Sequence, residues 1–138
     1  MPNEKFRYPV LVGFGDANVE GTIYWSRYFE WFGKAREVFL FYFCPDFLAL
    51  YKSGLRIDTH ETNIKHLSPG FFGDKIILEM HVGEIKKVSV NLAVDFIREA
   101  DQKKIAEGWQ VTVFTNCEGN LTPIPPEIRE PLLKYLAE

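Results

Sequence analysis

The sequence predicts an α+β protein in which one long helix packs against an antiparallel sheet of about five strands. The first observation is a segment of roughly twenty residues whose apolar side chains recur with helical spacing. The second is that other segments of the chain alternate between apolar and polar residues, as half-buried strands do. Because the order is strand, long helix and then four strands, a helix layer on a sheet layer is a complete way to bury the apolar surface.

Strands are expected in five places. The first covers Phe6 to Phe14, where every second residue is apolar. A second, near 57–67, alternates less clearly because most of its residues are polar. Three more follow at 76–82, 88–96 and 105–113, and the short turns at 84–87 and 99–103 predict antiparallel hairpins. In the last segment the alternation puts the following residues on the same face: Ile105, Trp109, Val111 and Val113.

The long helix is expected from Tyr24 to Phe43, before Pro45 ends the segment. Its polar side carries Ser26, Arg27, Glu30, Lys34 and Glu37. Its apolar side, which we expect to face the sheet, carries Tyr28, Trp31, Phe32, Ala35, Val38, Phe39 and Tyr42. A short C-terminal helix is expected within "PPEIREPLLKYLAE", which has proline near its first turn.

Composition excludes several classes of protein. The 138 residues, 46% of them apolar, fit a single domain spanning residues 1–138. A net charge of -3 offers no basic surface to nucleic acid. Cys44 and Cys117 have neither disulfide-scaffold nor zinc-site spacing, and we expect both to be buried. No apolar run approaches the roughly 20 residues of a membrane span, so we expect a soluble, cytoplasmic protein.

A short stretch carries a specific resemblance. Phe14 to Arg36 reads "FGDANVEGTIYWSRYFEWFGKAR", and the turn "PGFFGD" follows at 69–74. Together with the order of elements, these residues resemble the hotdog fold and, within it, the 4-hydroxybenzoyl-CoA thioesterase-like family. The resemblance implies a thioesterase that hydrolyses an acyl-CoA or an acyl-carrier-protein thioester, in polyketide or fatty acid metabolism. It also implies no cofactor or metal, and a homodimer or homotetramer with the active site at a subunit interface.

The family's catalytic position is altered in this chain. Members resembling this protein carry an aspartate in the loop before the long helix and a glycine three residues later, where this chain has Asn18 and Gly21. A carboxamide is neither a nucleophile nor a general base near neutral pH. One explanation is lost activity, which would leave an acyl-ligand binding protein. The other is similarity to thioesterases of enediyne polyketide pathways, which resemble this chain in an Asn at this place and in a "GxxRE" segment, here "GKARE" from Gly33 to Glu37.

Arg36 is the second principal candidate. On a helical wheel it lies beside Trp25 and Phe29, so its guanidinium needs a partner. In a structural role it would pair with Glu20 or Glu37, or reach solvent. In a catalytic role it would stabilise negative charge on the thioester oxygen or orient water, while Asn18 holds that water. Backbone N–H groups around Tyr24 and Trp25 would add oxyanion donors at the helix start.

The remaining candidates have weaker support. Glu20 is either a general base or a solvated carboxylate favoured by the helix N-terminus. The resemblance implies that Asp16 supports the loop, with a direct part in the chemistry as the alternative. Lys86 and Lys87 sit at a hairpin, where the family resemblance implies contact with coenzyme A phosphates. The alternatives are contact with an acidic carrier protein or two solvated lysines. The acyl group is expected to lie along the residues Gly21, Tyr24, Tyr28 and Phe32.

Histidines provide the last alternatives. His60 and His66 fall on one face of the second strand, where a structural or interface role is favoured over a metal pair because no further ligands lie nearby. A hotdog dehydratase or hydratase would need a histidine with a carboxylate as its acid–base pair. The loop before the long helix contains no histidine, which argues against that activity.

Overall fold

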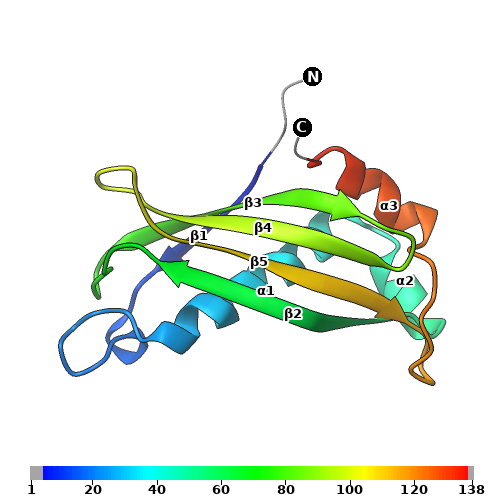
Figure 1. Ribbon diagram of the computed structural model, residues 1–138, viewed down its shortest axis with the longest axis horizontal. Helices are drawn as coiled ribbons and strands as arrows, with labels where there is room; N and C mark the ends of the chain where they lie inside the picture. The colour runs from blue at the N-terminus through cyan, green and yellow to red at the C-terminus, as the bar shows by residue number, and fades with distance from the viewer. Residues whose placement is uncertain (1–4, 137–138) are drawn as a thin grey trace.

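The computed structural model describes residues 5–136 and contains one five-stranded antiparallel sheet (Figure 1). The strands lie in the order β1-β3-β4-β5-β2, which makes β1 and β2 the edges. Their bounds are β1 Phe6–Leu11, β2 Arg56–His66, β3 Lys75–Ile85, β4 Ser89–Arg98 and β5 Lys103–Thr115. The helices are α1 Trp25–Phe43, α2 Phe47–Lys52 and α3 Pro126–Leu133, and a short 3-10 turn covers Phe14–Asp16.

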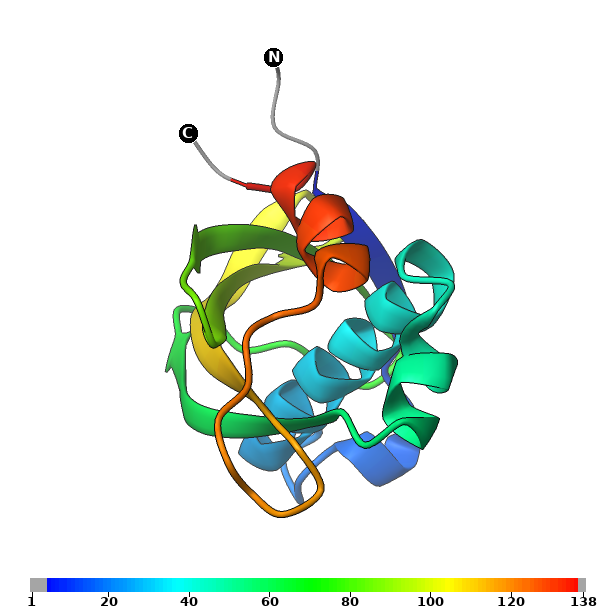
Figure 2. The same ribbon diagram turned by 90° about the vertical axis from the view of Figure 1, so that its right-hand side faces the viewer.

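The sheet curves around α1, as the end-on view shows (Figure 2). The side of α1 that meets the sheet is buried: Tyr28, Phe32, Ala35, Phe39 and Leu40. Opposite them, the alternate residues of β3 and β4 are also buried: Ile76, Leu78, Met80 and Val82, then Val90, Leu92, Val94 and Phe96. The α+β prediction, with one long helix on about five strands and a short C-terminal helix, is therefore confirmed.

The predicted inward-facing residues of β5 were wrong beyond Ile105. The register moves from Phe96↔Ala106 to Ile97↔Lys104, so Ile105 is an extra residue that bulges from the β4–β5 ladder. Ile105 and Ala106 are both buried, and from there the helix-facing positions are Gln110, Thr112 and Phe114. Trp109, Val111 and Val113 therefore lie on the opposite face from Ile105, because one inserted residue reverses the alternation.

Three local expectations also need correction. Phe14 does not extend the first strand but begins the 3-10 turn, because the chain bends after Leu11 to reach α1. Tyr42 is exposed rather than packed on the sheet, whereas the next residue, Phe43, packs edge to face on Phe6 of β1. Cys117 is exposed in a turn, whereas Cys44 is buried as expected. The helix α2 was not predicted. Within residues 5–136 no helix is both long and apolar enough to span a membrane.

Candidate active site

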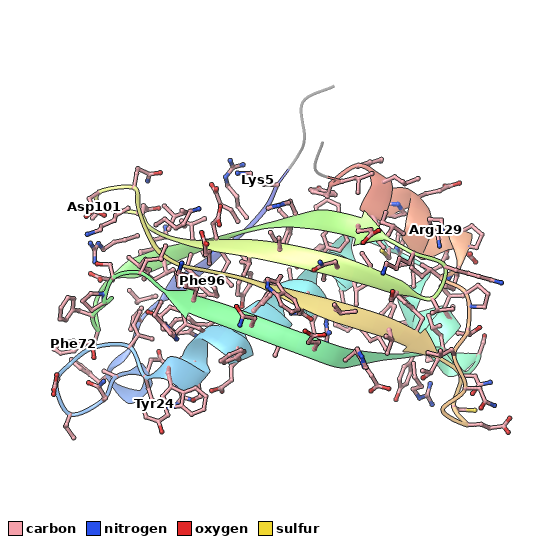
Figure 3. All side chains as sticks on the ribbon, viewed as in Figure 1. Lys5, Tyr24, Phe72, Phe96, Asp101 and Arg129 are labelled. Carbon is pink, nitrogen blue, oxygen red and sulfur yellow. The ribbon has the colours of Figure 1, made fainter. Side chains whose placement is uncertain are left out.

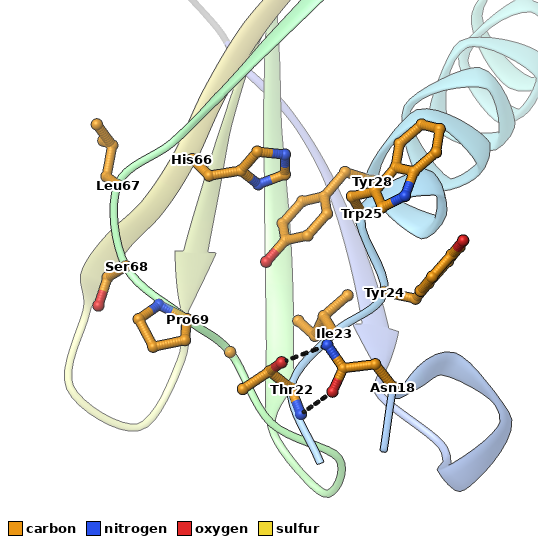
Figure 4. A pocket seen from close by; sticks show the side chains of 11 residues that line it. Asn18, Thr22, Ile23, Tyr24, Trp25, Tyr28, His66, Leu67, Ser68 and Pro69 are labelled. Carbon is orange, nitrogen blue, oxygen red and sulfur yellow. Dashed lines mark hydrogen bonds between the residues drawn. The ribbon is translucent and has the colours of Figure 1, made fainter. Parts of the chain in front are cut away.

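A cleft of about 490 Å³ lies where the start of α1 meets the loop after β2 (Figure 4). One wall comes from residues 18–28, which include the loop before α1 and its first turn. The other wall comes from the end of β2 and the following loop. The lining residues are Asn18, Thr22, Ile23, Tyr24, Trp25, Tyr28, His66, Leu67, Ser68, Pro69 and Gly70. The cleft thus joins the two segments that carry the family resemblance.

The two walls are joined by backbone hydrogen bonds. The Ile23 amide donates to the Gly70 carbonyl at 2.9 Å, and the Phe72 amide donates to the Gly21 carbonyl at 3.1 Å. Glycine at position 70 allows this approach without displacing a neighbour, because a Cβ there would come to 2.5 Å from Ile23 Cδ1. Gly21 has a φ of 85°, a left-handed conformation that other residues rarely adopt. Both glycines therefore hold the cleft together, although Gly21 does not line it.

The carboxamide of Asn18 is largely used within its own loop. Its Oδ1 accepts the amides of Glu20 at 2.9 Å and Thr22 at 3.2 Å, and its Nδ2 donates to Thr22 Oγ1 at 2.7 Å (Figure 4). Both lone pairs of Oδ1 are occupied, so one Nδ2 hydrogen is left for a ligand. In this geometry Asn18 can donate to a water or a carbonyl, but it cannot also accept from one.

The start of α1 retains free backbone donors, though not the expected pair. The Tyr24 amide donates to the Asp16 carbonyl at 2.8 Å and is therefore occupied. The Arg27 amide donates to the Tyr24 carbonyl at 3.0 Å, whereas the amides of Trp25 and Ser26 have no acceptor among the described residues. The oxyanion donors available at the helix start are consequently those of Trp25 and Ser26.

Asp16 supports the loop, as the sequence suggested. One carboxylate oxygen accepts the Gly13 amide at 2.8 Å and the other pairs with Arg27 Nε at 3.0 Å. Arg27 also donates to Glu30, which ties the loop to the first turns of α1. Because both of its oxygens are engaged, Asp16 serves structure at this end of the helix.

Tyr28 and His66 lie side by side in the lining of the cleft. Their rings meet edge to face with centroids 4.8 Å apart, and Figure 4 shows the Tyr28 hydroxyl pointing from α1 across the cleft. Desolvation, with a smaller contribution from the Asp74 carboxylate, raises the pKa of Tyr28 to about 12. The phenol therefore remains a hydrogen-bond donor throughout the neutral range.

Arg36 lies away from this cleft, farther along α1. It is eleven residues beyond Trp25, roughly 16 Å along the helix, and does not line the cleft. Its Nη1 donates to Thr59 Oγ1 at 2.9 Å, Gln110 Oε1 at 2.7 Å and Thr112 Oγ1 at 3.1 Å. The expected partners were wrong, because these polar groups of β2 and β5 lie directly under the helix at this level.

The guanidinium of Arg36 still has an unused edge. Its Nε is buried and has no hydrogen-bond partner in the described chain. Burial lowers the pKa of Arg36, an effect that the nearby carboxylates of Glu37 and Asp58 oppose. Arg36 also borders a second hollow of about 420 Å³, between α1, α2 and β2, whose walls include Leu40, Phe41 and Ile57.

The other predicted residues are not brought to the cleft within one chain. Glu20 is exposed beside it, and Phe32 lies fully buried in the core. Lys86 and Lys87 occupy the β3–β4 turn, held by Arg129, which donates to the Lys86 carbonyl at 2.7 Å. Figure 3 labels Tyr24 and Phe72 at one end of the molecule and Arg129 at the opposite end. Over the part of the chain that the structure describes, no group of His, Cys, Asp or Glu side chains could hold a metal ion.

Sequence reasoning assigned no role to Thr22 or Ser68 and only a structural or interface role to His66, yet all three line the cleft. For His66 the available signal was its position at the end of a strand, immediately before "LSPGFFGD". The loop ending in Asp74 returns to the helix start, and that return brings His66 with it. The pattern of a single strand does not show which loop will close against it.

A long helix wrapped by one antiparallel sheet, with a cleft where the helix begins, defines a hotdog protein. The sequence profile of the thioesterase-like superfamily matches residues 12–132, so the chain belongs to that superfamily. A comparison with curated protein sequences finds no match.

Solved structures share this fold closely. A structure of the dynemicin thioesterase aligns with a TM-score of 0.93 at 23% identity, covering 98% of this chain and 99% of the other. A gentisyl-coenzyme A thioesterase aligns at 0.79 with 24% identity, covering 92% of this chain and 98% of the other. A Staphylococcus aureus protein in complex with CoA aligns at 0.89 with 13% identity, covering 98% of this chain and 85% of the other. At these identities the likeness establishes the fold.

Proposed function

We propose that this protein hydrolyses an acyl thioester in the cleft at the start of α1. The observation that supports this best is the set of uncharged donors that surrounds the cleft without a carboxylate: Asn18 Nδ2, the Tyr28 hydroxyl and the unoccupied amide of Trp25. Such donors stabilise an oxyanion when they are fixed in advance, and the hydrogen bonds between the two loops fix them here. The altered position 18 is then compatible with catalysis.

The chemistry asked of these groups is modest. A thioester carbonyl that points at the helix start would receive hydrogen bonds that strengthen as charge develops on its oxygen. The positive end of the α1 dipole acts in the same direction. Because a thioester is already reactive, orientation and electrostatic stabilisation can supply much of the acceleration. The similarity to the dynemicin thioesterase supports this view in its fold.

Arg36 takes part through a second copy of the chain. The edge strand β2 has exposed residues throughout 58–63 and contains neither proline nor glycine, so it is free to pair with another strand. If two β2 strands pair antiparallel about their middle, the Thr59 end of one protomer lies beside the His66 end of the other. Arg36, which contacts Thr59, would then reach the partner's cleft.

Exposed apolar side chains at both ends of α1 support this arrangement. Phe14 and Trp25 are exposed near the cleft, while Phe41 and Leu48 are exposed near Arg36. Antiparallel pairing would place the apolar side chains near the cleft of one protomer against those near Arg36 of its partner and remove both sets from water. We therefore propose a homodimer with two shared sites, or a homotetramer built from such dimers.

Mixing two inactive variants tests the shared site. Asn18→Ala and Arg36→Met proteins are unfolded together, refolded and assayed for thiol release from acyl-CoA substrates. If Asn18 and Arg36 act in one site across the interface, about a quarter of the sites in the mixture regain both groups, because half of the dimers are mixed. Activity that stays at the level of the separate variants would show that the two residues do not share a site in this way.

The carrier of the acyl group is a separate question. With antiparallel pairing, Lys86 and Lys87 of one protomer would lie toward the partner's cleft and could contact coenzyme A phosphates. A double Gln variant should then raise KM for acyl-CoA and leave kcat unchanged, whereas an unchanged KM would favour a protein carrier. A protein that binds acyl-CoA without turnover of any thioester would instead be the non-catalytic binding hotdog.

A further inference from the structure

We infer that His66 is the general base of this cleft, an assignment that rests on the proposed thioesterase function. The eleven lining residues include no aspartate or glutamate. Histidine is the side chain whose ordinary pKa lies closest to neutrality, and His66 is the one histidine in the lining. If water attacks the thioester here, the imidazole is the group of the lining that can take its proton near neutral pH.

The position of His66 suits that role. It is the last residue of β2, it is exposed, and neither ring nitrogen forms a hydrogen bond to a described residue. The Tyr28 ring holds the imidazole from one side through its edge-to-face contact. One nitrogen can therefore face a water in the cleft while the ring orientation is limited by packing.

The charges near His66 are few. From α1 the Tyr28 phenol faces it, and from β5 its register partner is the uncharged Ala106. From the loop side, the Asp74 carboxylate acts on Tyr28 and accepts the Phe71 amide at 3.0 Å. The Arg98 guanidinium pairs with Asp74 at 3.9 Å and donates to the Pro69 carbonyl of the cleft loop at 3.1 Å. Lys65 is adjacent in sequence, and alternation turns its side chain to the other face of the sheet, beside Glu107, the residue opposite it in the β2–β5 register.

The proton path balances with water as the only co-reactant. As the water oxygen forms its bond to the thioester carbon, one of its protons passes to the imidazole. The Tyr28 hydroxyl and the Trp25 amide hold the developing oxyanion. When the carbon–sulfur bond breaks, the imidazolium returns the proton to the thiolate, giving a carboxylic acid and a free thiol. No carboxylate is required at position 18.

The test uses the full chain and a panel of substrates from acetyl-CoA to palmitoyl-CoA, with benzoyl-CoA included. His66→Gln should lower kcat for the best substrate by roughly 10²- to 10⁴-fold with little change in KM. The parent's kcat/KM should fall on the acid side of its pH profile, and the residual activity of the variant should lack that fall. His81→Gln, on the opposite face of the sheet, is the matched control and should keep both the rate and the pH profile.

A second variant separates proton transfer from a structural effect. His66→Gly should regain activity when imidazole is added to the assay, and thermal unfolding of each variant reports whether it has folded. A His66→Gln protein with the parent's rate and pH profile would overturn the assignment and leave the thioesterase function standing. A parent that hydrolyses no thioester in the panel would instead overturn the proposed function, and this inference with it.

Discussion

Replacement of Arg36 by methionine and by lysine separates its structural role from its catalytic one. Methionine removes all three hydrogen bonds from Nη1 and leaves Gln110 and Thr112, which are 3% and 2% exposed, without their charged donor. Leaving such acceptors unsatisfied costs about 2–4 kcal/mol of stability in total, allowing for the remaining bond from Thr112 to Gln110. The melting temperature should then fall on the order of 10 °C.

Lysine at the same position keeps a charged donor for these acceptors, so its stability loss should stay below about 1 kcal/mol. Lysine cannot reproduce the planar edge formed by Nε and Nη2, of which Nε has no partner in the described chain. If Nη2, the accessible atom of that edge, serves the thioester oxygen or the attacking water of the neighbouring site, Arg36→Lys should lose on the order of 10- to 1000-fold in turnover.

The two measurements are urea unfolding and thiol release from the best acyl-CoA substrate. We expect Arg36→Met to lose much stability. We expect Arg36→Lys to lose little stability but much turnover. A folded Arg36→Lys protein with full activity would refute the catalytic role. Arg36 would then be an anchor between α1 and the sheet and nothing more.

Substitutions at Asn18, Tyr28 and Gly108 have definite expected outcomes. Asn18→Ala should remove most turnover while costing about 1 kcal/mol of stability, since two loop amides lose their acceptor. Asn18→Asp keeps an acceptor for both amides and should be only partly active, because a carboxylate that accepts two amides has a lowered pKa and is a weak base. Burial raises the pKa of Tyr28 from 10.0 to about 12 on folding, so its contribution to stability is complete below pH 10.0 and is lost as the pH rises toward 12. Tyr28→Phe should therefore flatten the decline of the unfolding free energy between pH 10 and 12. Gly108→Ala should cost about 1–3 kcal/mol, because its Cβ would collide with the Asn63 carbonyl of the edge strand, whereas Gly15→Ala meets nothing within 4 Å and should be neutral by thermal unfolding.

The sequence by itself determined the layers of this protein. Periodicity located α1 to within one residue at its start, and the buried alternate residues of β3 and β4 fall within the predicted ranges 76–82 and 88–96, although Val88 lies before β4 and is only half-buried. These segments are readable because each buries one continuous face against one neighbour. Asn18, Tyr24, Trp25 and Tyr28 were also singled out from their short shared stretch, and all four line the cleft.

Tertiary structure alone decided how those groups are used. The bulge at Ile105 reversed the faces of β5, because register depends on both strands of a ladder rather than on the alternation of one. It also decided that Arg36 bonds to Thr59, Gln110 and Thr112, partners that lie 23 to 76 residues away in sequence. His66 reached the cleft because the loop after β2 closes on the start of α1, a contact between distant segments that no local pattern encodes.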